Sequence, residues 1–175
     1  MIFKNISNFQ NLHDYFPIII SALIVDMIVL SRMVFGYIKI KSLNKWYNKF
    51  GFLAVVADVL SIVIGIIIAR FLYSILFSQY SLILFIFLTC LIQIIHDLSF
   101  AYFFNIIPRN KSIILDVFKD YGKEVGLTIL LADSLMIIGT ILLASFITTL
   151  NINLQIIIFI VSLYLLPYLL FSIQQ

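Results

Sequence analysis

Acidic side chains inside apolar stretches are the residues of this chain best placed to do chemistry. Half of its eight acidic residues lie in such stretches, and all of these are aspartates: Asp26, Asp58, Asp97 and Asp133. A carboxylate costs ~2.5 kcal/mol or more to insert into hydrocarbon. Each is therefore expected to be protonated, paired with another group, or in contact with water.

Polar residues accompany the aspartates at helical spacing. Ser61 follows Asp58 by three residues, and Gln93 precedes Asp97 by four. His96 is adjacent to Asp97 in sequence, so a helix would point it about 100° away. The predicted intramembrane polar cluster consists of Asp26, Asp58, Asp97, Asp133, His96, Gln93 and Ser61. Two interpretations are open: a path for protons or cations, or a hydrogen-bonded clasp between helices. No metal site and no cofactor is predicted.

The elements that carry these residues are predicted to be membrane-spanning helices. The chain has 175 residues, 63% hydrophobic and only 11% charged, whereas soluble proteins are about a quarter charged. A helix needs about 20 apolar residues to cross a bilayer. Five stretches qualify, at about 16–38, 51–73, 80–104, 126–148 and 154–171. The predicted fold class is an all-α, polytopic transmembrane helical bundle.

Basic residues predict the orientation, because cytoplasmic loops are rich in Lys and Arg. Eight of them lie in the loops after the first and third spans, against Lys4 on the other side. The N-terminus is therefore expected outside (lumenal) and the C-terminus on the cytoplasmic side. Predicted inner-face contacts to lipid or partners are Lys39, Lys41, Lys45, Trp46, Lys49, Arg109, Lys111, Lys119 and Lys123. Arg32 and Arg70 are expected to reach out to the two interfaces.

Two parts of the chain match at an offset of 75 residues, Trp46–Phe71 and Tyr121–Phe146. The informative identities are a glycine, an Ala-Asp pair and a later Ala-x-Phe. We therefore expect a parallel duplication of a two-helix hairpin, with spans one and two repeated as spans three and four. The predicted organisation is one membrane domain, with an N-terminal interfacial segment (1–15), a four-helix core (16–148), and a fifth span with the C-terminus (149–175).

Two segments outside the spans show amphipathic periodicity. Apolar residues recur at helical spacing from Ile2 to Phe16, which favours an interfacial helix. Residues 112–124 show a similar pattern, for which a solvated loop is an equal alternative.

Several functions are excluded or disfavoured. The chain has no Gly-rich phosphate loop, no Ser-His-Asp order, no HExxH and no CxxC, so no enzyme activity is expected. A net charge of +3 without a basic domain face argues against nucleic acid as a partner. No soluble small-molecule substrate is identified.

Four segments carry a family resemblance: Leu43–Phe71, His96-Asp97, Asp116–Tyr121 and Leu131–Ser134. Over residues 16–148 the chain resembles small polytopic membrane proteins of nucleocytoplasmic large DNA viruses. The resemblance implies a viral structural or scaffolding protein of an internal virion membrane derived from the host endoplasmic reticulum. Its basic inner loops would contact capsid or other membrane proteins. Alternatives are a small proton- or cation-conducting protein that uses the aspartates, and a subunit of a larger membrane complex, with a homo-oligomer also open.

Overall fold

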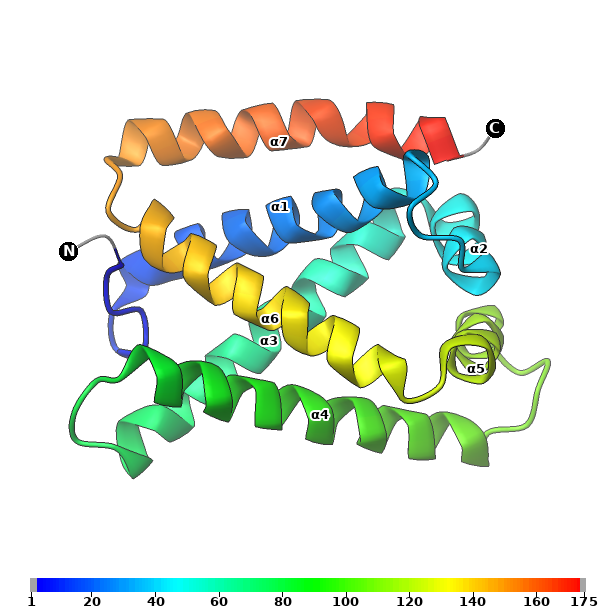
Figure 1. Cartoon of the computed structure of the whole chain (residues 1–175), viewed down its shortest axis with the longest axis horizontal. Coiled ribbons are helices and arrows are strands. Elements are labelled where there is room, and N and C mark those ends of the chain that lie inside the picture. The colour runs from blue at the N-terminus through cyan, green and yellow to red at the C-terminus, as the bar shows by residue number, and fades with distance from the viewer. Residues whose placement is uncertain (1–2, 174–175) are drawn as a thin grey trace.

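The computed structural model describes residues 3–173, which form helices joined by short connections (Figure 1). The chain order is η1 (Leu12–Asp14), α1 (Tyr15–Val34), α2 (Lys41–Phe50), α3 (Phe52–Leu76), α4 (Leu82–Ile106), α5 (Ile113–Val125), α6 (Thr128–Ile147) and α7 (Ile152–Ile173). Five helices, α1, α3, α4, α6 and α7, are long and apolar enough to cross a membrane. The predicted class is confirmed: the chain is a multi-pass integral membrane protein, and its described part contains helices and no strands.

The five spans are helical because of their apolar composition, and Pro167 inside α7 does not end that helix. Each is apolar around most of its circumference, and an α-helix satisfies its backbone polar groups internally, as a bilayer requires. The 25 residues of α3 extend about 37 Å. That length exceeds a hydrocarbon core of about 30 Å and permits tilting.

α2 and α5 are amphipathic and lie together at one end of the bundle, which we call the basic end (Figure 1). α5 confirms the helical alternative for residues 112–124, and the Ser112 hydroxyl caps its N-terminus. α2 corrects the sequence interpretation, which treated residues 39–50 as a loop. Its apolar residues Leu43, Trp46, Tyr47 and Phe50 follow the i, i+3, i+4, i+7 pattern of a helix with one buried face.

The first six α-helices repeat one architecture twice, as α1–α2–α3 and α4–α5–α6. α1 packs on α3 as α4 packs on α6, and α1 packs on α6 as α4 packs on α3. α2 and α5, which are equivalent, pack on each other. This reciprocal pattern is that of a two-fold axis relating two halves. The predicted repeat therefore has a structural counterpart that also includes the amphipathic helices.

The junction between amphipathic helix and span is repeated in detail. Gly51 has φ +53° and ψ −124°, and Gly126, 75 residues later, has φ +63° and ψ −143°. Each glycine N–H donates to the carbonyl four residues earlier, on Tyr47 at 2.8 Å and on Gly122 at 3.0 Å. The left-handed backbone explains why both repeats retain glycine here.

α7 stands outside the repeat. It packs along α1 and touches α2, so it covers one side of the first half (Figure 1). Phe16 of α1 and Phe159 of α7 contribute an edge-to-face ring contact at 5.4 Å between centroids.

The described N-terminal residues are not helical before Leu12, contrary to the periodicity of this segment. Three asparagine side chains account for the difference. Oδ1 of Asn5, Asn8 and Asn11 each accepts a hydrogen bond from the backbone N–H two residues later. Such Asx turns compete with helix formation. The segment instead folds onto the bundle, where Ile6 is buried and the Lys4 N–H donates to the Ser145 carbonyl.

Candidate functional site

The four intramembrane aspartates lie in two groups near the basic end of the bundle. The first, the Tyr47 group, contains Asp26 of α1, Trp46 and Tyr47 of α2, and Asp58 of α3. The second, the Asp97 group, contains Gln93, His96 and Asp97 of α4, and Asp133 of α6. Sequence reasoning predicted one cluster, whereas the structure pairs the aspartates within each half of the repeat.

Tyr47 is the centre of the first group. Its hydroxyl oxygen lies 2.9 Å from Asp26 Oδ1 and 2.9 Å from Asp58 Oδ2. The Trp46 indole N–H donates to the same Asp58 oxygen at 3.0 Å. Tyr47 is 3% exposed and Asp26 is 0% exposed. α2 therefore inserts two polar ring substituents between the spans and connects α1 to α3.

The number of available hydrogens determines the protonation of this group. A phenol carries a single O–H hydrogen, so the Tyr47 hydroxyl can donate to one carboxylate only. The second contact of 2.9 Å is a hydrogen bond only if the other carboxyl donates to the Tyr47 oxygen. The geometry thus fits one protonated and one ionised aspartate. Asp26 Oδ2 is buried with no hydrogen-bond partner.

Asp97 is the centre of the second group. The Gln93 side-chain amide donates to Asp97 Oδ1 at 2.8 Å, as the spacing of four residues predicted. Asp133 lies beside Asp97, close enough for the two carboxyls to interact. Asp97 Oδ2 is buried and has no partner.

His96 also belongs to this group, which corrects the expectation that it points away from Asp97. Its Nδ1 lies 3.1 Å from Asp97 Oδ1, and its ring stacks on Phe100 at 4.3 Å. The imidazole bends back along the helix, so a rotation of about 100° between neighbouring Cα–Cβ bonds does not prevent the contact. The side chains of His96 and Asp97 are 36% and 14% exposed, whereas Asp26 is fully buried.

Tyr121 of α5 lies between the two groups. Burial raises the pKa of its hydroxyl well above the usual range. Three nearby carboxyls raise that pKa further, those of Asp133, Asp58 and Asp97. Burial, followed by the charges of Asp58 and Asp26, likewise raises the pKa of the Tyr47 hydroxyl. Both phenols therefore stay neutral, so each can donate one hydrogen bond and accept others.

The structure places six of the predicted residues in these two groups and Ser61 in neither. Among residues 3–173, Ser61 forms no hydrogen bond with an aspartate. Sequence reasoning placed Trp46 at the lipid interface, but it is buried and packs on Phe50 and Phe118. Tyr47 and Tyr121 were missed as site residues. The signal was the helical spacing of Leu43, Trp46, Tyr47 and Phe50, together with the alignment of Trp46 with Tyr121.

The residues predicted to line the inner face lie around α2 and α5. All of them are exposed except Trp46, which is buried, and Lys119, which is partly buried. Two of them are paired: Lys45 and Arg109 both contact the Asp120 carboxylate, at 3.2 and 2.9 Å. Lys119 donates to the Ile107 carbonyl. Hydrogen bonds from Arg109 and Lys45 lower the pKa of Asp120.

Glu124 of α5 binds the N-terminus of α2. Its two oxygens accept from the backbone N–H groups of Lys41 and Ser42, each at 2.8 Å, and from the Ser42 hydroxyl at 2.6 Å. A carboxylate is favourable at this position because helix N-termini present unpaired N–H groups and a partial positive charge. The hydrogen bonds from Ser42 and Lys41 lower the pKa of Glu124.

Arg70 closes the opposite end, which we call the N-terminal end. It was expected to reach the interface, yet it is 0% exposed. Its Nη2 lies 3.3 Å from Asp14 Oδ2 and donates to the carbonyls of Asn8 and Asn11. The guanidinium also lies 4.3 Å from the ring centroid of Tyr15. The N-terminal segment supplies these partners to Nη2, whereas Nε and Nη1 are buried without a hydrogen-bond partner, so burial of the charge is compensated in part.

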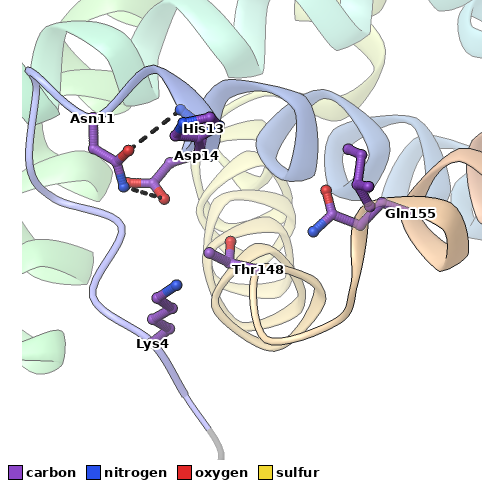
Figure 2. Close-up of a pocket in the computed structure, with 7 residues that line it drawn as sticks. Lys4, Asn11, His13, Asp14, Thr148 and Gln155 are labelled. Atoms are coloured by element: carbon purple, nitrogen blue, oxygen red, sulfur yellow. Dashed lines mark hydrogen bonds between the residues drawn. The ribbon is translucent and has the colours of Figure 1, made fainter.

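A polar cavity of about 290 Å³ lies beside this ion pair (Figure 2). Lys4, Asn11, His13, Asp14, Thr148 and Gln155 line it, together with Ile152. In Figure 2 the Asn11 side chain bonds both Asp14 and the backbone of His13, which fixes one wall.

Within residues 3–173 no three His, Cys, Asp or Glu side chains converge closely enough to ligate a metal. No known family model, curated protein or solved structure matches the chain. The assignment of function therefore depends on the side chains themselves.

Proposed function

We propose that this membrane protein conducts protons through its intramembrane carboxyl groups. The observation that carries the proposal is the Tyr47 hydroxyl, 2.9 Å from a carboxyl oxygen on each of two helices. In one concerted step the Asp58 carboxyl gives its proton to the Tyr47 oxygen while the Tyr47 proton passes to the Asp26 carboxylate. One proton moves from Asp58 to Asp26, and the phenol is regenerated.

The remaining polar residues support a route in both directions from this step. Towards the basic end, Tyr121 and the Asp97 group lead to His96, whose side chain is 36% exposed. Towards the N-terminal end, α1 and α6 carry the buried hydroxyls of Ser21, Thr140 and Ser145. Those of Thr140 and Ser145 have no hydrogen-bond partner. A hydroxyl can pass a proton because it donates and accepts at the same atom.

Proton flux into liposomes tests the proposal. The full chain is reconstituted, a potassium diffusion potential is applied, and an entrapped pH-sensitive dye reports uptake. We expect Tyr47→Phe to lower the flux by roughly a hundredfold, the scale of a lost proton-transfer group. Asp58→Asn and Asp133→Asn each remove a carboxyl group from the route and should abolish the proton flux. The matched control is Tyr37→Phe, since Tyr37 is 81% exposed in the loop before α2. Flux no greater than that of empty liposomes, or equal flux in Tyr47→Phe, contradicts the proposal.

A second candidate function is the structural one that the family resemblance implies, in a virion membrane. The observation in its favour is the group of exposed lysines at the basic end: Lys39, Lys41, Lys49, Lys111 and Lys123. These could bind an acidic capsid or membrane protein. Charge reversal at Lys49 and Lys123 should then abolish co-purification of one acidic partner, whereas Lys4→Glu should not. Recovery of that partner with the reversed variant contradicts this role.

The orientation stays a prediction from the charge bias, with the basic end on the cytoplasmic side. A cysteine placed at Lys49 in a Cys90→Ala background should react with a membrane-impermeant maleimide only after the cytoplasmic side is opened. A cysteine at Lys4 should react without opening. The reverse labelling pattern would show that the orientation is inverted.

A further inference from the structure

The left-handed backbone positions of this protein are concentrated beside α2 and α5. Within residues 3–173, the residues with positive φ are Gly36 (+74°), Gly51 (+53°), Asn110 (+69°) and Gly126 (+63°). Gly36 and Gly51 flank α2, and Asn110 and Gly126 flank α5. A Cβ atom at Gly51 or Gly126 would meet no atom within 4 Å. Backbone conformation, not lack of space, therefore requires glycine there, and each amphipathic helix lies between two sharp turns of the chain.

On the aqueous side, α2 and α5 are joined by contacts that water and salt can break. Glu124 binds the N-terminus of α2, and Lys45 pairs with Asp120 at 3.2 Å. The side chains of Lys45 and Asp120 are 51% and 35% exposed. Exposed ion pairs contribute little to stability. This side of the contact therefore permits separation of the two helices.

On the bilayer side, α2 makes three polar contacts with carboxyl groups, and two of them converge on one oxygen atom; the third joins the Tyr47 hydroxyl to Asp26 Oδ1. Asp58 Oδ2 accepts from the Trp46 indole N–H at 3.0 Å and lies 2.9 Å from the Tyr47 hydroxyl. Hydrogen bonds to an ionised carboxylate are roughly twice as strong as neutral ones. Protonation of Asp58 removes the charge that strengthens these two bonds, and leaves the contact with Tyr47 as a weaker, neutral hydrogen bond.

The two halves differ at this point. The position equivalent to Tyr47 is Gly122, which has no side chain that could reach a carboxyl. α5 therefore lacks the phenol that ties α2 to the spans. Of the two amphipathic helices, α2 is therefore the one whose attachment depends on Asp58.

We propose that α2 is a gate over the intramembrane carboxyls, which turns at Gly36 and Gly51 and is released from α5 when Asp58 takes up a proton. This inference rests on the proposed function and names the regulation of the same site. The groups that face Asp58 are Tyr47 and Trp46 of α2, Asp26 of α1 through Tyr47, Tyr121 of α5 and Asp133 of α6. None of these groups is a cation, so no neighbour neutralises the Asp58 carboxylate, and only a bound proton can do so.

Distance measurements between α2 and α5 test the gate without any flux assay. Spin labels are attached to cysteines at the exposed positions 49 and 123 of the full chain, in a Cys90→Ala background in lipid nanodiscs. We expect one distance at neutral pH in the otherwise unchanged chain. Asp58→Asn, which imitates the protonated carboxyl, should shift part of the distribution to longer distances, and added Glu124→Gln should enlarge that part.

The matched control is Ser61→Ala on the same helix, which should keep the original distribution. If Asp58→Asn does not fold, the unchanged chain is measured at mildly acidic pH, where Glu124 and Asp120 stay ionised because their pKa values are lowered. A longer-distance population supports the gate, and an unchanged distribution in every sample overturns it. A chain whose gate opens but which gives no proton flux would refute the proposed function alone.

Discussion

Replacing Arg70 with methionine should destabilise the protein more than any other single substitution of a basic residue. Arg70 and Asp14 are both 0% exposed and form an ion pair at 3.3 Å. Removing one partner of a buried pair costs ~3–5 kcal/mol, because the other charge is left buried and uncompensated. The variant also loses the bonds to the carbonyls of Asn8 and Asn11 and the contact with Tyr15.

A cost of this size has a measurable consequence. Every ~1.4 kcal/mol changes an equilibrium constant tenfold, so Arg70→Met should lower the folding equilibrium constant by roughly a hundredfold or more. The double variant Arg70→Met with Asp14→Asn removes both charges and should recover much of the loss. The control is Arg32→Met on α1, whose exposed side chain should contribute no more than ~0.5 kcal/mol.

Equilibrium unfolding of the detergent-solubilised chain in increasing SDS, followed by helical circular dichroism, measures these differences. The coupling energy between the two positions is obtained from the double-variant cycle. A loss in Arg70→Met no larger than that in Arg32→Met would refute the reasoning. Strictly additive losses in the double variant would show that the two side chains do not act as a pair.

Two further predictions concern the basic end and the core. The pKa of Glu124 is lowered in the folded protein. Its contact with Ser42 therefore stabilises the fold fully above pH 4.5, the ordinary pKa of a glutamate, and this stabilisation is lost as the pH falls through the lower folded pKa. The hydrogen-exchange protection of the Ser42 amide should therefore decrease below that pH, and constant protection would contradict it. Gly65→Ala should cost about 1 kcal/mol in the SDS assay, because its Cβ would lie 3.3 Å from Gln93 Oε1. The matched Gly122→Ala meets no atom within 4 Å and should be neutral or stabilising, so equal losses would contradict the packing argument.

The spans could be predicted because length and hydrophobicity alone determine whether a helix crosses a bilayer. All five appear within a few residues of their predicted bounds. α2 was missed because its lysines resemble a solvated loop, although Leu43, Trp46, Tyr47 and Phe50 carry the helical pattern. Charged residues and a buried apolar face are compatible in a helix at the membrane surface.

The pairing of the aspartates could not be predicted because sequence gives depth along a helix but not the order of helices around the bundle. Asp26 meets Asp58, and Asp97 meets Asp133, only because α1 packs on α3 and α4 on α6. The contact through Tyr47 needs a further element, α2, that lies outside the spans.

The N-terminal end shows a different limit. Apolar periodicity predicted a helix, but Asn5, Asn8 and Asn11 form local turns instead. That irregular segment supplies the acceptors that bury Arg70. A charged residue near the end of a span can therefore be buried when a loop provides partners, a possibility that span-by-span reasoning does not consider.

Differences between the two halves give the two groups of aspartates unequal exposure. Lys45 and Asp120 occupy equivalent positions in the two halves and contact each other across the two-fold axis. Identical halves would place two like charges there, so this ion pair requires the halves to differ. The Asp97 group is partly open through His96, whereas the Tyr47 group is sealed by Trp46 and Tyr47. In two identical halves both groups would have the same exposure and the same affinity for a proton. Because one half carries Trp-Tyr where the other carries Tyr-Gly, the proposed route joins one partly exposed group to one sealed group, and the proton gradient sets the direction of flux between them.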